Sequence, residues 1–320
     1  MSRRLGWSFW LRLAVSGTAL TGIVAWLRRD LGKAWHLVMG MAWWTIPGAA
    51  ALYLLAVVLV SERFRRILSA FDVELSLVHT TQLSVIGLFF NNFLPTSVGG
   101  DVVKAHCASQ LARRKAEPYL AVFADRLCGL ITVVALGLCG ALATHDPAVH
   151  RGPFFITGVV MLAAGLWALW QLPDYLPRLL QLAGRRWRRL NEMPFVQRLS
   201  ALFARRIFTG RRTISVLAIS IVMQLVCITA VFVLAKGLSL PISLWQLILV
   251  TPLIWAVGLL PSFNGLGVRE GAFVYFLGGS AGREGAFALS LLWLAVITIV
   301  SLLGAPAYLA SGVANEGGRA

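Results

Sequence analysis

Two stretches of the chain combine helix-breaking residues with ionisable side chains. Residues 91–101 read Asn-Asn-Phe-Leu-Pro-Thr-Ser-Val-Gly-Gly-Asp, and residues 260–270 read Leu-Pro-Ser-Phe-Asn-Gly-Leu-Gly-Val-Arg-Glu. In both, a proline is followed four residues later by a glycine and then by charged residues. Proline removes a helical hydrogen bond and glycine permits unusual backbone angles. We therefore expect broken helices at Pro95, Gly99, Gly100, Pro261, Gly265 and Gly267.

Broken helices within a membrane favour the binding of an anion at a transport site. Their half-helix N-termini and free N–H groups attract an anion, and interrupted segments at corresponding places in two halves of a chain indicate a transporter site. A single Pro-Gly stretch is more often an ordinary loop. Two of them in register, each with charges beside an apolar run, favour the binding site.

A second group of ionisable residues lies inside an apolar run. Asp125 and Arg126 fall a turn or two into the run 119–143, and neighbours in a helix point to different faces, so their partners lie elsewhere. We expect Asp101 to pair with Arg126, and Arg269 with Asp125. Such pairs can simply fix helix packing. The functional alternative is that Arg126 or Arg269 holds a lipid phosphate through bidentate contacts.

The other polar residues of the two stretches would support such a phosphate site. Asp101 and Glu270 would orient the arginines, contact an amine or sugar of the headgroup, or carry protons. The amides of Asn91, Asn92 and Asn264 would add neutral hydrogen bonds to the headgroup.

The composition identifies the class of protein that positions these residues. Of 320 residues, 58 % are hydrophobic and 13 % charged, whereas a soluble domain carries about 25 % charged residues. A net charge of +16 suits nucleic acid, but a nucleic-acid binder needs its charges on a wettable face. Here the charges separate long apolar runs. This pattern excludes a disordered chain, a secreted disulfide scaffold and an ordinary cytosolic enzyme.

The apolar runs predict an all-α polytopic membrane protein with about eight helical segments. A run of about 18 residues crosses the hydrocarbon layer, and lipid offers no water to unpaired backbone groups, so the segments must be helices. They lie at 9–27, 38–60, 74–94, 119–143, 152–172, 213–236, 243–261 and 286–311.

The chain is predicted to form a single transmembrane domain of two inverted halves. The two prolines lie 166 residues apart, and the apolar runs that follow them are offset by nearly the same amount. The first half covers about 8–143 and the second about 152–311.

Charge counting favours two re-entrant segments, at 74–94 and 243–261. With 95–118 and 262–285 as loops, the inner face then collects 21 Lys and Arg residues and the outer face 7, as the positive-inside rule prefers. Ten of the inner charges are arginines of the basic loop 173–212. This loop suits either amphipathic helices on an anionic membrane surface or a plain topology anchor.

Several motifs of soluble catalysis are absent from the sequence. There is no nucleotide-binding P-loop, no nucleophile elbow and no zinc-protease pattern, and neither the five histidines nor the four cysteines have ligand spacing. We therefore expect no ATP hydrolysis, no metal site and no cofactor.

The motifs resemble those of the lysylphosphatidylglycerol synthase transmembrane family. The resemblance rests on residues 91–101, on Asp125-Arg126 and on Gly265-Leu266-Gly267-Val268-Arg269-Glu270-Gly271, and it covers about residues 10–310. It implies a helical membrane domain with two re-entrant elements that moves lipids or lipid-linked headgroups between leaflets. The aminoacyltransferase domain of the full synthases is not expected here, so the chain is not expected to aminoacylate lipid.

We therefore expect a flippase rather than an enzyme, with a phospholipid or a lipid-linked headgroup as substrate and no use of ATP. The substrate is expected to pass through a groove between the two broken-helix motifs. The expected partners are anionic or lipid-linked membrane lipids and no nucleic acid, with a homo-oligomer or a partner enzyme left open. One alternative is an intramembrane transferase with Asp101, Asp125 or Glu270 as base, and another is a membrane subunit that recruits an enzyme. The preference for Arg over Lys, 25 to 4, and the richness in Ala and Gly suggest a GC-rich bacterial genome, and we expect a multi-pass protein of the bacterial cytoplasmic membrane.

Overall fold

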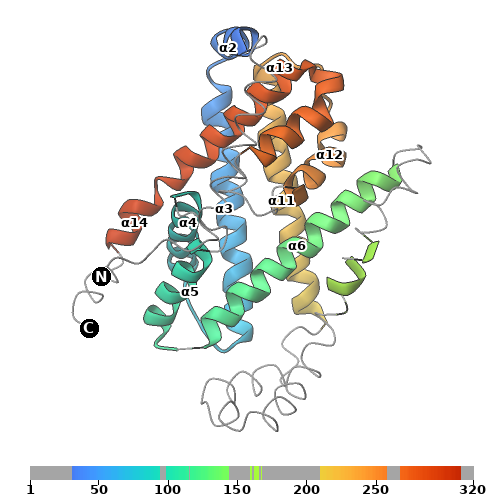
Figure 1. Cartoon of the computed structure of the whole chain (residues 1–320). Coiled ribbons are helices and arrows are strands. Elements are labelled where there is room, and N and C mark those ends of the chain that lie inside the picture. Colours follow the sequence, from blue (N-terminus) through green and yellow to red (C-terminus); the bar gives the residue numbers. More distant parts are fainter. Residues whose placement is uncertain are drawn as a thin grey trace, which may run out of the picture.

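The computed structural model describes residues 31–93, 99–114, 116–143, 159–160, 162–165, 167, 210–257 and 267–310. Within these residues the regular structure is entirely helical (Figure 1). The helices are α2 (Leu31–Met39), α3 (Thr45–Ala70), α4 (Leu77–Phe93), α5 (Gly99–Ala112), α6 (Glu117–Ala143), α11 (Arg211–Gly237), α12 (Leu244–Val257), α13 (Val268–Ser301) and α14 (Gly304–Ala310).

Four stretches of the described chain are long and apolar enough to cross a membrane: Thr45–Ala70, Glu117–Gly140, Arg211–Gly237 and Val268–Ala310. At 1.5 Å per residue even the shortest exceeds a hydrocarbon layer of about 30 Å. The helix α12 is apolar but has only 14 residues. The predicted all-α polytopic membrane fold is therefore confirmed.

The helices α3 and α11 run antiparallel along their whole length at the centre of the bundle (Figure 1). At one end Gly237 packs directly against Thr45, where any larger side chain would collide. Lower down, Arg63 Nη1 donates to Ser220 Oγ at 2.9 Å, and Arg66 donates to Ser215. Residue numbers thus rise along one helix as they fall along the other.

The helices α4 and α5 form a hairpin where the sequence predicts a helix followed by a loop. Their backbones touch, because a Cβ on Gly100 would overlap the carbonyl oxygen of Gly87 and lie 2.5 Å from the backbone nitrogen of Asn91. The expected loop 95–118 is wrong over Gly99–Ala112, which is helical. Its glycines and alanines permit a close helix contact, so this segment needs no long apolar run to pack.

The second half contains a matching hairpin. It consists of α12 and the first part of α13, which ends where Gly282 adopts φ +72° and interrupts the helix. Gln246 Nε2 donates to Ser280 Oγ at 2.8 Å and joins the two arms. The expected loop 262–285 is wrong from Val268 onward, because that part is helical.

The helix bounds recur along the chain at a nearly constant offset. Helix α3 begins at Thr45 and α11 at Arg211, which is 166 positions later, and α4 and α12 begin 167 positions apart. The first hairpin opens towards the end where α3 finishes. The second opens towards the opposite end, where α11 finishes and Gly285 packs against Leu240.

The predicted segments match the helices unevenly. Three of them, 74–94, 119–143 and 213–236, agree closely with α4, α6 and α11. The segment 38–60 is shifted, since α3 extends to Ala70 with Phe64, Ile67, Leu68 and Phe71 buried at helical spacing. The segment 9–27, the loop 173–209 and most of 152–172 lie outside the described residues.

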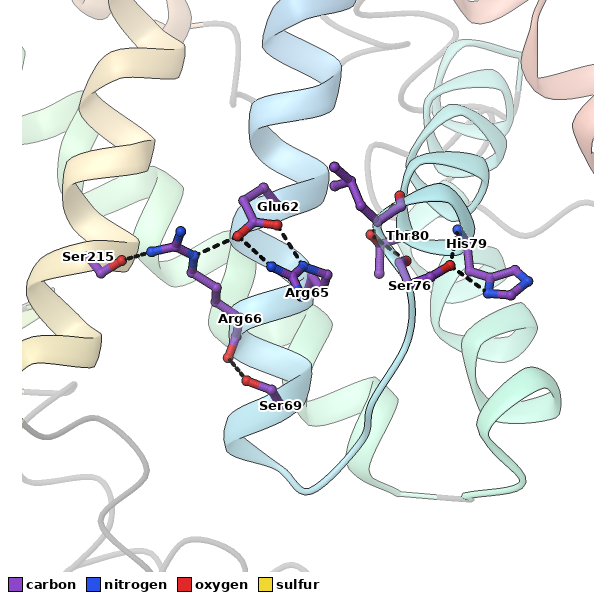
Figure 2. Close-up of polar contacts among 9 residues, drawn as sticks. Glu62, Arg65, Arg66, Ser69, Ser76, His79, Thr80 and Ser215 are labelled. Carbon is purple, nitrogen blue, oxygen red and sulfur yellow. Dashed lines mark hydrogen bonds and ion pairs between the residues drawn. The ribbon is translucent and has the colours of Figure 1, made fainter.

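The two ends of the bundle differ in their exposed residues. Tryptophans gather where α3 begins, as an interfacial belt does, and arginines gather where α3 finishes. In Figure 2, Glu62 accepts bonds from Arg65 and Arg66 at this second end, and Arg66 also reaches Ser215 of α11. The arginines favour the cytoplasmic side for this end. The residues concerned are Trp35, Trp43, Trp44 and Trp245 at the first end, and Arg65, Arg66, Arg113, Arg114, Arg211 and Arg212 at the second.

Candidate functional site

A cavity of about 500 Å³ lies between α3, the first hairpin and α6, with one side chain each from α11 and α12. Its walls are largely apolar and include Leu88, Leu130, Val133 and Trp255. The ionisable residues that line it come from three helices, and they are Arg63, Asp101, Lys104, Asp125 and Arg126.

The pair of Arg126 and Asp101 stands where the sequence predicts it. Arg126 Nε of α6 donates to Asp101 Oδ2 in the first turn of α5. A carboxylate there is also stabilised by the positive end of the helix dipole. The Arg126 side chain is 46 % exposed, whereas that of Asp101 is 15 % exposed, so the pair lies at the rim of the cavity.

A second ion pair lies deeper in the protein and joins three helices. Arg63 Nε of α3 donates to Asp125 Oδ1 of α6 at 2.7 Å, and both side chains are buried. Arg63 also bonds to Ser220 of α11. Gly129 of α6 packs beside the guanidinium, since an added Cβ would lie 3.5 Å from Arg63 Nη1, at ordinary van der Waals contact.

The ammonium of Lys104 faces the same carboxylate from α5. Lys104 Nζ lies 3.6 Å from Asp125 Oδ2 and 3.8 Å from the centre of the Phe64 ring. Its stem crosses Gly87 of α4, where an added Cβ would lie 3.2 Å from Lys104 Cβ. Three cations and two carboxylates therefore line the cavity, which leaves one positive charge in excess.

The predicted headgroup ligands Asn91 and Asn92 hydrogen-bond to different parts of the protein. Asn91 Oδ1 accepts from the backbone N–H of Gly100 at 2.9 Å, and its Nδ2 lies 3.4 Å from Asp101 Oδ1, so it ties the hairpin to the rim pair. Asn92 Nδ2 instead donates to Thr298 and Ser301 of α13, which places the first hairpin against the second half.

The predicted partner of Asp125 is wrong, because Arg63 and Lys104 pair with it and Arg269 does not. Arg269 Nη2 lies 2.9 Å from Glu270 Oε1, and Glu270 Oε2 accepts from the N–H of Gly267 at 2.6 Å. Glu270 is fully buried, and this network caps the start of α13. Neither Arg269 nor Glu270 is among the residues that line the cavity.

The structure describes only some of the residues that were predicted to break helices. Gly99 begins α5, Gly100 makes the close contact with Gly87, and Gly267 has φ +82°. Among the described residues no cluster of three or more His, Cys, Asp or Glu side chains is placed to hold a metal ion. Pro95, Pro261, Asn264 and Gly265 lie outside the described part of the chain.

Sequence reasoning missed Arg63 and Lys104 as site residues, since both fall in ranges that were expected to be loops. A signal for Arg63 exists, because the apolar spacing of Phe64, Ile67, Leu68 and Phe71 carries the helix beyond residue 60. Lys104 has no comparable signal, because the helix around it is only weakly amphipathic.

The comparisons with known proteins agree with the helical membrane fold. A family model described as "Lysylphosphatidylglycerol synthase TM region" matches residues 9–304, which is most of the chain. No individual curated protein matches the chain. The match covers almost the full length of a chain with four candidate membrane spans in its described part, and the chain belongs to the lysylphosphatidylglycerol synthase transmembrane-region family.

Proposed function

We propose that this protein moves a phospholipid or a lipid-linked headgroup between the leaflets of the membrane without hydrolysing ATP. Family membership assigns the chain a function related to membrane lipids. The observation that carries the finer proposal is the cavity itself, where three cations and two carboxylates lie among apolar walls in a membrane-spanning bundle.

The charges of the cavity suit a phosphate. A bare phosphate loses its hydration in the hydrocarbon layer at a cost of several kcal/mol, and cations already fixed in the cavity offset that cost. Arg126 presents a planar fork of donors that matches two phosphate oxygens. Because Arg126 is half exposed at the rim, a phosphate can share it with Asp101 before moving inward.

The walls of the cavity suit acyl chains. Leu88, Leu130, Val133 and Trp255 provide apolar surface beside the charged residues, so the chains can stay in lipid while the headgroup occupies the cavity. Phe123 lines the cavity too and is 57 % exposed on the outer surface of α6, which gives a lateral path to lipid.

The hairpins supply a means of alternating access. At 17 and 14 residues, α4 and α5 extend about 26 and 21 Å, too short to cross about 30 Å of hydrocarbon, so we assign them to a re-entrant hairpin. The second hairpin opens to the other side of the bundle. In transporters built from inverted repeats, one half rocks against the other around a site near the middle of the membrane.

The two predicted proton carriers take different roles in this proposal. Asp101 lies at the rim of the cavity and pairs with one partly exposed arginine, so it is the candidate for coupling to a proton gradient. Glu270 is fully buried and bound by Arg269 and Gly267, so we assign it to holding the start of α13.

A vesicle assay tests the proposal. The purified protein is reconstituted with fluorescent phosphatidylglycerol or a fluorescent glycosylated lipid, and the fraction reached by a membrane-impermeant quencher is followed over time. We expect the wild-type protein to accelerate the exchange of at least one of these lipids. Arg126→Gln and Asp101→Asn should each reduce the rate at least tenfold, whereas Arg65→Gln, outside the cavity, should leave it unchanged. Wild-type vesicles that exchange no lipid faster than protein-free vesicles would contradict the proposal.

A further inference from the structure

Lys104 is the cavity cation whose donors are least satisfied. Its side chain is 7 % exposed, and the ion pair with Asp125 at 3.6 Å is longer than a hydrogen bond. Its other contact is the face of the Phe64 ring. By comparison, Arg63 donates to Asp125 and Ser220 within 2.9 Å, and Arg126 donates to Asp101. A buried ammonium with spare donors favours an additional acceptor.

Gln224 of α11 has an unused amide in the same cavity. The residue is 6 % exposed and lines the cavity one turn along α11 from Ser220, the partner of Arg63. Among the described residues, its side chain takes part in no hydrogen bond. A glutamine amide offers two donors and one acceptor oxygen. Those of Gln224 remain accessible from the cavity, since the fully buried unpaired atoms of the described side chains are Thr213 Oγ1 and Thr251 Oγ1.

We propose that Lys104 and Gln224 form an inner oxyanion subsite that receives the phosphate of a phosphodiester lipid after it leaves Arg126. The subsite joins the two halves of the protein, since Lys104 belongs to the first hairpin and Gln224 to the central helix of the second half. This proposal deepens and rests on the proposed function, because it names the substrate class and the residues that hold it inside the cavity.

The charge count supports a phosphodiester as the ligand. The cavity holds one positive charge in excess, and a phosphodiester carries one negative charge, so occupation neutralises it. Arg63 and Arg126 donate directly to the two carboxylates, whereas Lys104 shares Asp125 only at 3.6 Å, so its ammonium keeps donors for the ligand. A neutral lipid without a phosphate would satisfy neither Lys104 nor the excess charge.

Native mass spectrometry of the full chain in detergent tests the subsite. It compares the affinity for dioleoyl-phosphatidylglycerol with that for dioleoylglycerol, which has the same chains and no phosphate. The variants are Lys104→Met, which keeps the apolar stem on Gly87 and Phe64, and Gln224→Leu. The matched control is Lys236→Met, which removes an exposed lysine over the Phe232 ring outside the cavity.

We expect the wild-type protein to prefer the phosphate-bearing lipid. Lys104→Met should weaken its binding at least tenfold and Gln224→Leu about threefold to tenfold, with the affinity for dioleoylglycerol unchanged. Lys236→Met should bind as the wild type does. An unchanged preference in both cavity variants would overturn the subsite. If Lys104→Met fails to fold, the lipid preference of Gln224→Leu decides whether the subsite exists.

Two further measurements distinguish failure of the lipid subsite from failure of the proposed lipid movement. Inorganic phosphate that displaces phosphatidylglycerol would assign the subsite to free phosphate and overturn the lipid assignment, whereas persistent lipid binding supports it. The vesicle assay is run on the same preparations. A lost phosphate preference in Lys104→Met supports the subsite even if the wild type moves no lipid. Lipid movement with an intact preference in both variants overturns the subsite and leaves the proposed function standing.

Discussion

Arg63 of α3 and Asp125 of α6, 62 positions apart in sequence, form a buried ion pair with Nε 2.7 Å from Oδ1. Ser220 of α11 and Lys104 of α5 contact the same pair. One carboxylate thus organises side chains from four helices and from both halves of the protein. Removing one member of such a buried pair leaves the opposite charge uncompensated.

Removing the carboxylate should destabilise the protein. Asp125→Asn leaves Arg63 and Lys104 close together with no negative partner, and breaking a buried pair costs about 3–5 kcal/mol. We expect the melting temperature in detergent to fall by roughly 5–10 °C, read by the loss of monodisperse protein after heating. Glu62→Gln removes the carboxylate of an exposed pair and should shift it by less than about 2 °C. Equal melting temperatures for the two variants would contradict the account.

The first hairpin should depend on the glycine that brings its arms together. In Gly100→Ala, the new Cβ would overlap the carbonyl oxygen of Gly87, so the arms must separate and Asn91 must release the N–H of residue 100. We expect lipid exchange to fall at least tenfold and the melting temperature to drop. Gly279→Ala is the matched control, because nothing lies within 4 Å of its added Cβ. A Gly100→Ala protein with normal exchange would show that the close contact is dispensable.

The two hairpins should open to opposite sides of the membrane. Cysteines are introduced at exposed positions in a Cys139→Ser background, since Cys107, Cys128 and Cys227 are buried. An impermeant maleimide is applied to intact cells and then to permeabilised cells. Glu74→Cys and Arg113→Cys flank the first hairpin and should react only after permeabilisation. Ser243→Cys and Arg283→Cys flank the second hairpin and should react in intact cells.

The result depends on whether the two positions that flank one hairpin react from the same side of the membrane. If α4 crossed the membrane as a plain span, Glu74→Cys and Arg113→Cys would react from different sides, and the re-entrant assignment would fail. If all four positions reacted from one side, the inverted arrangement of the halves would fail. The positive-inside rule fixes which side is cytoplasmic, through the arginines near the end of α3.

The sequence predicts the long apolar helices and the rim pair because both depend on local patterns. Runs of apolar residues identify α6 and α11 within two residues of their bounds, since lipid requires continuous helices. The pairing of Asp101 with Arg126 is predictable because a charge next to or within an apolar run needs a partner.

The inner cluster could not be predicted in the same way. The apolar spacing around Arg63 extends the helix but does not say that Arg63 is buried. Lys104 stands in a range of charged and small residues, which in isolation favours a loop. Whether such a lysine is buried depends on a glycine of another helix, here Gly87, that lets its stem pass. The choice of Arg63 over Arg269 as the partner of Asp125 follows from the packing of α3 against α6, and residue spacing does not encode that packing.

A variant that blocks the cavity without altering its charges shows whether the lipid headgroup passes through it. Leu130→Trp adds a bulky apolar side chain to the wall between α3 and α6, and Leu291→Trp adds the same side chain to an exposed position on α13. The initial rate of phosphatidylglycerol exchange is measured in vesicles of matched protein content. The account predicts a rate at least tenfold lower for Leu130→Trp and an unchanged rate for Leu291→Trp. Exchange at the wild-type rate by a folded Leu130→Trp protein would contradict passage of the headgroup through this cavity.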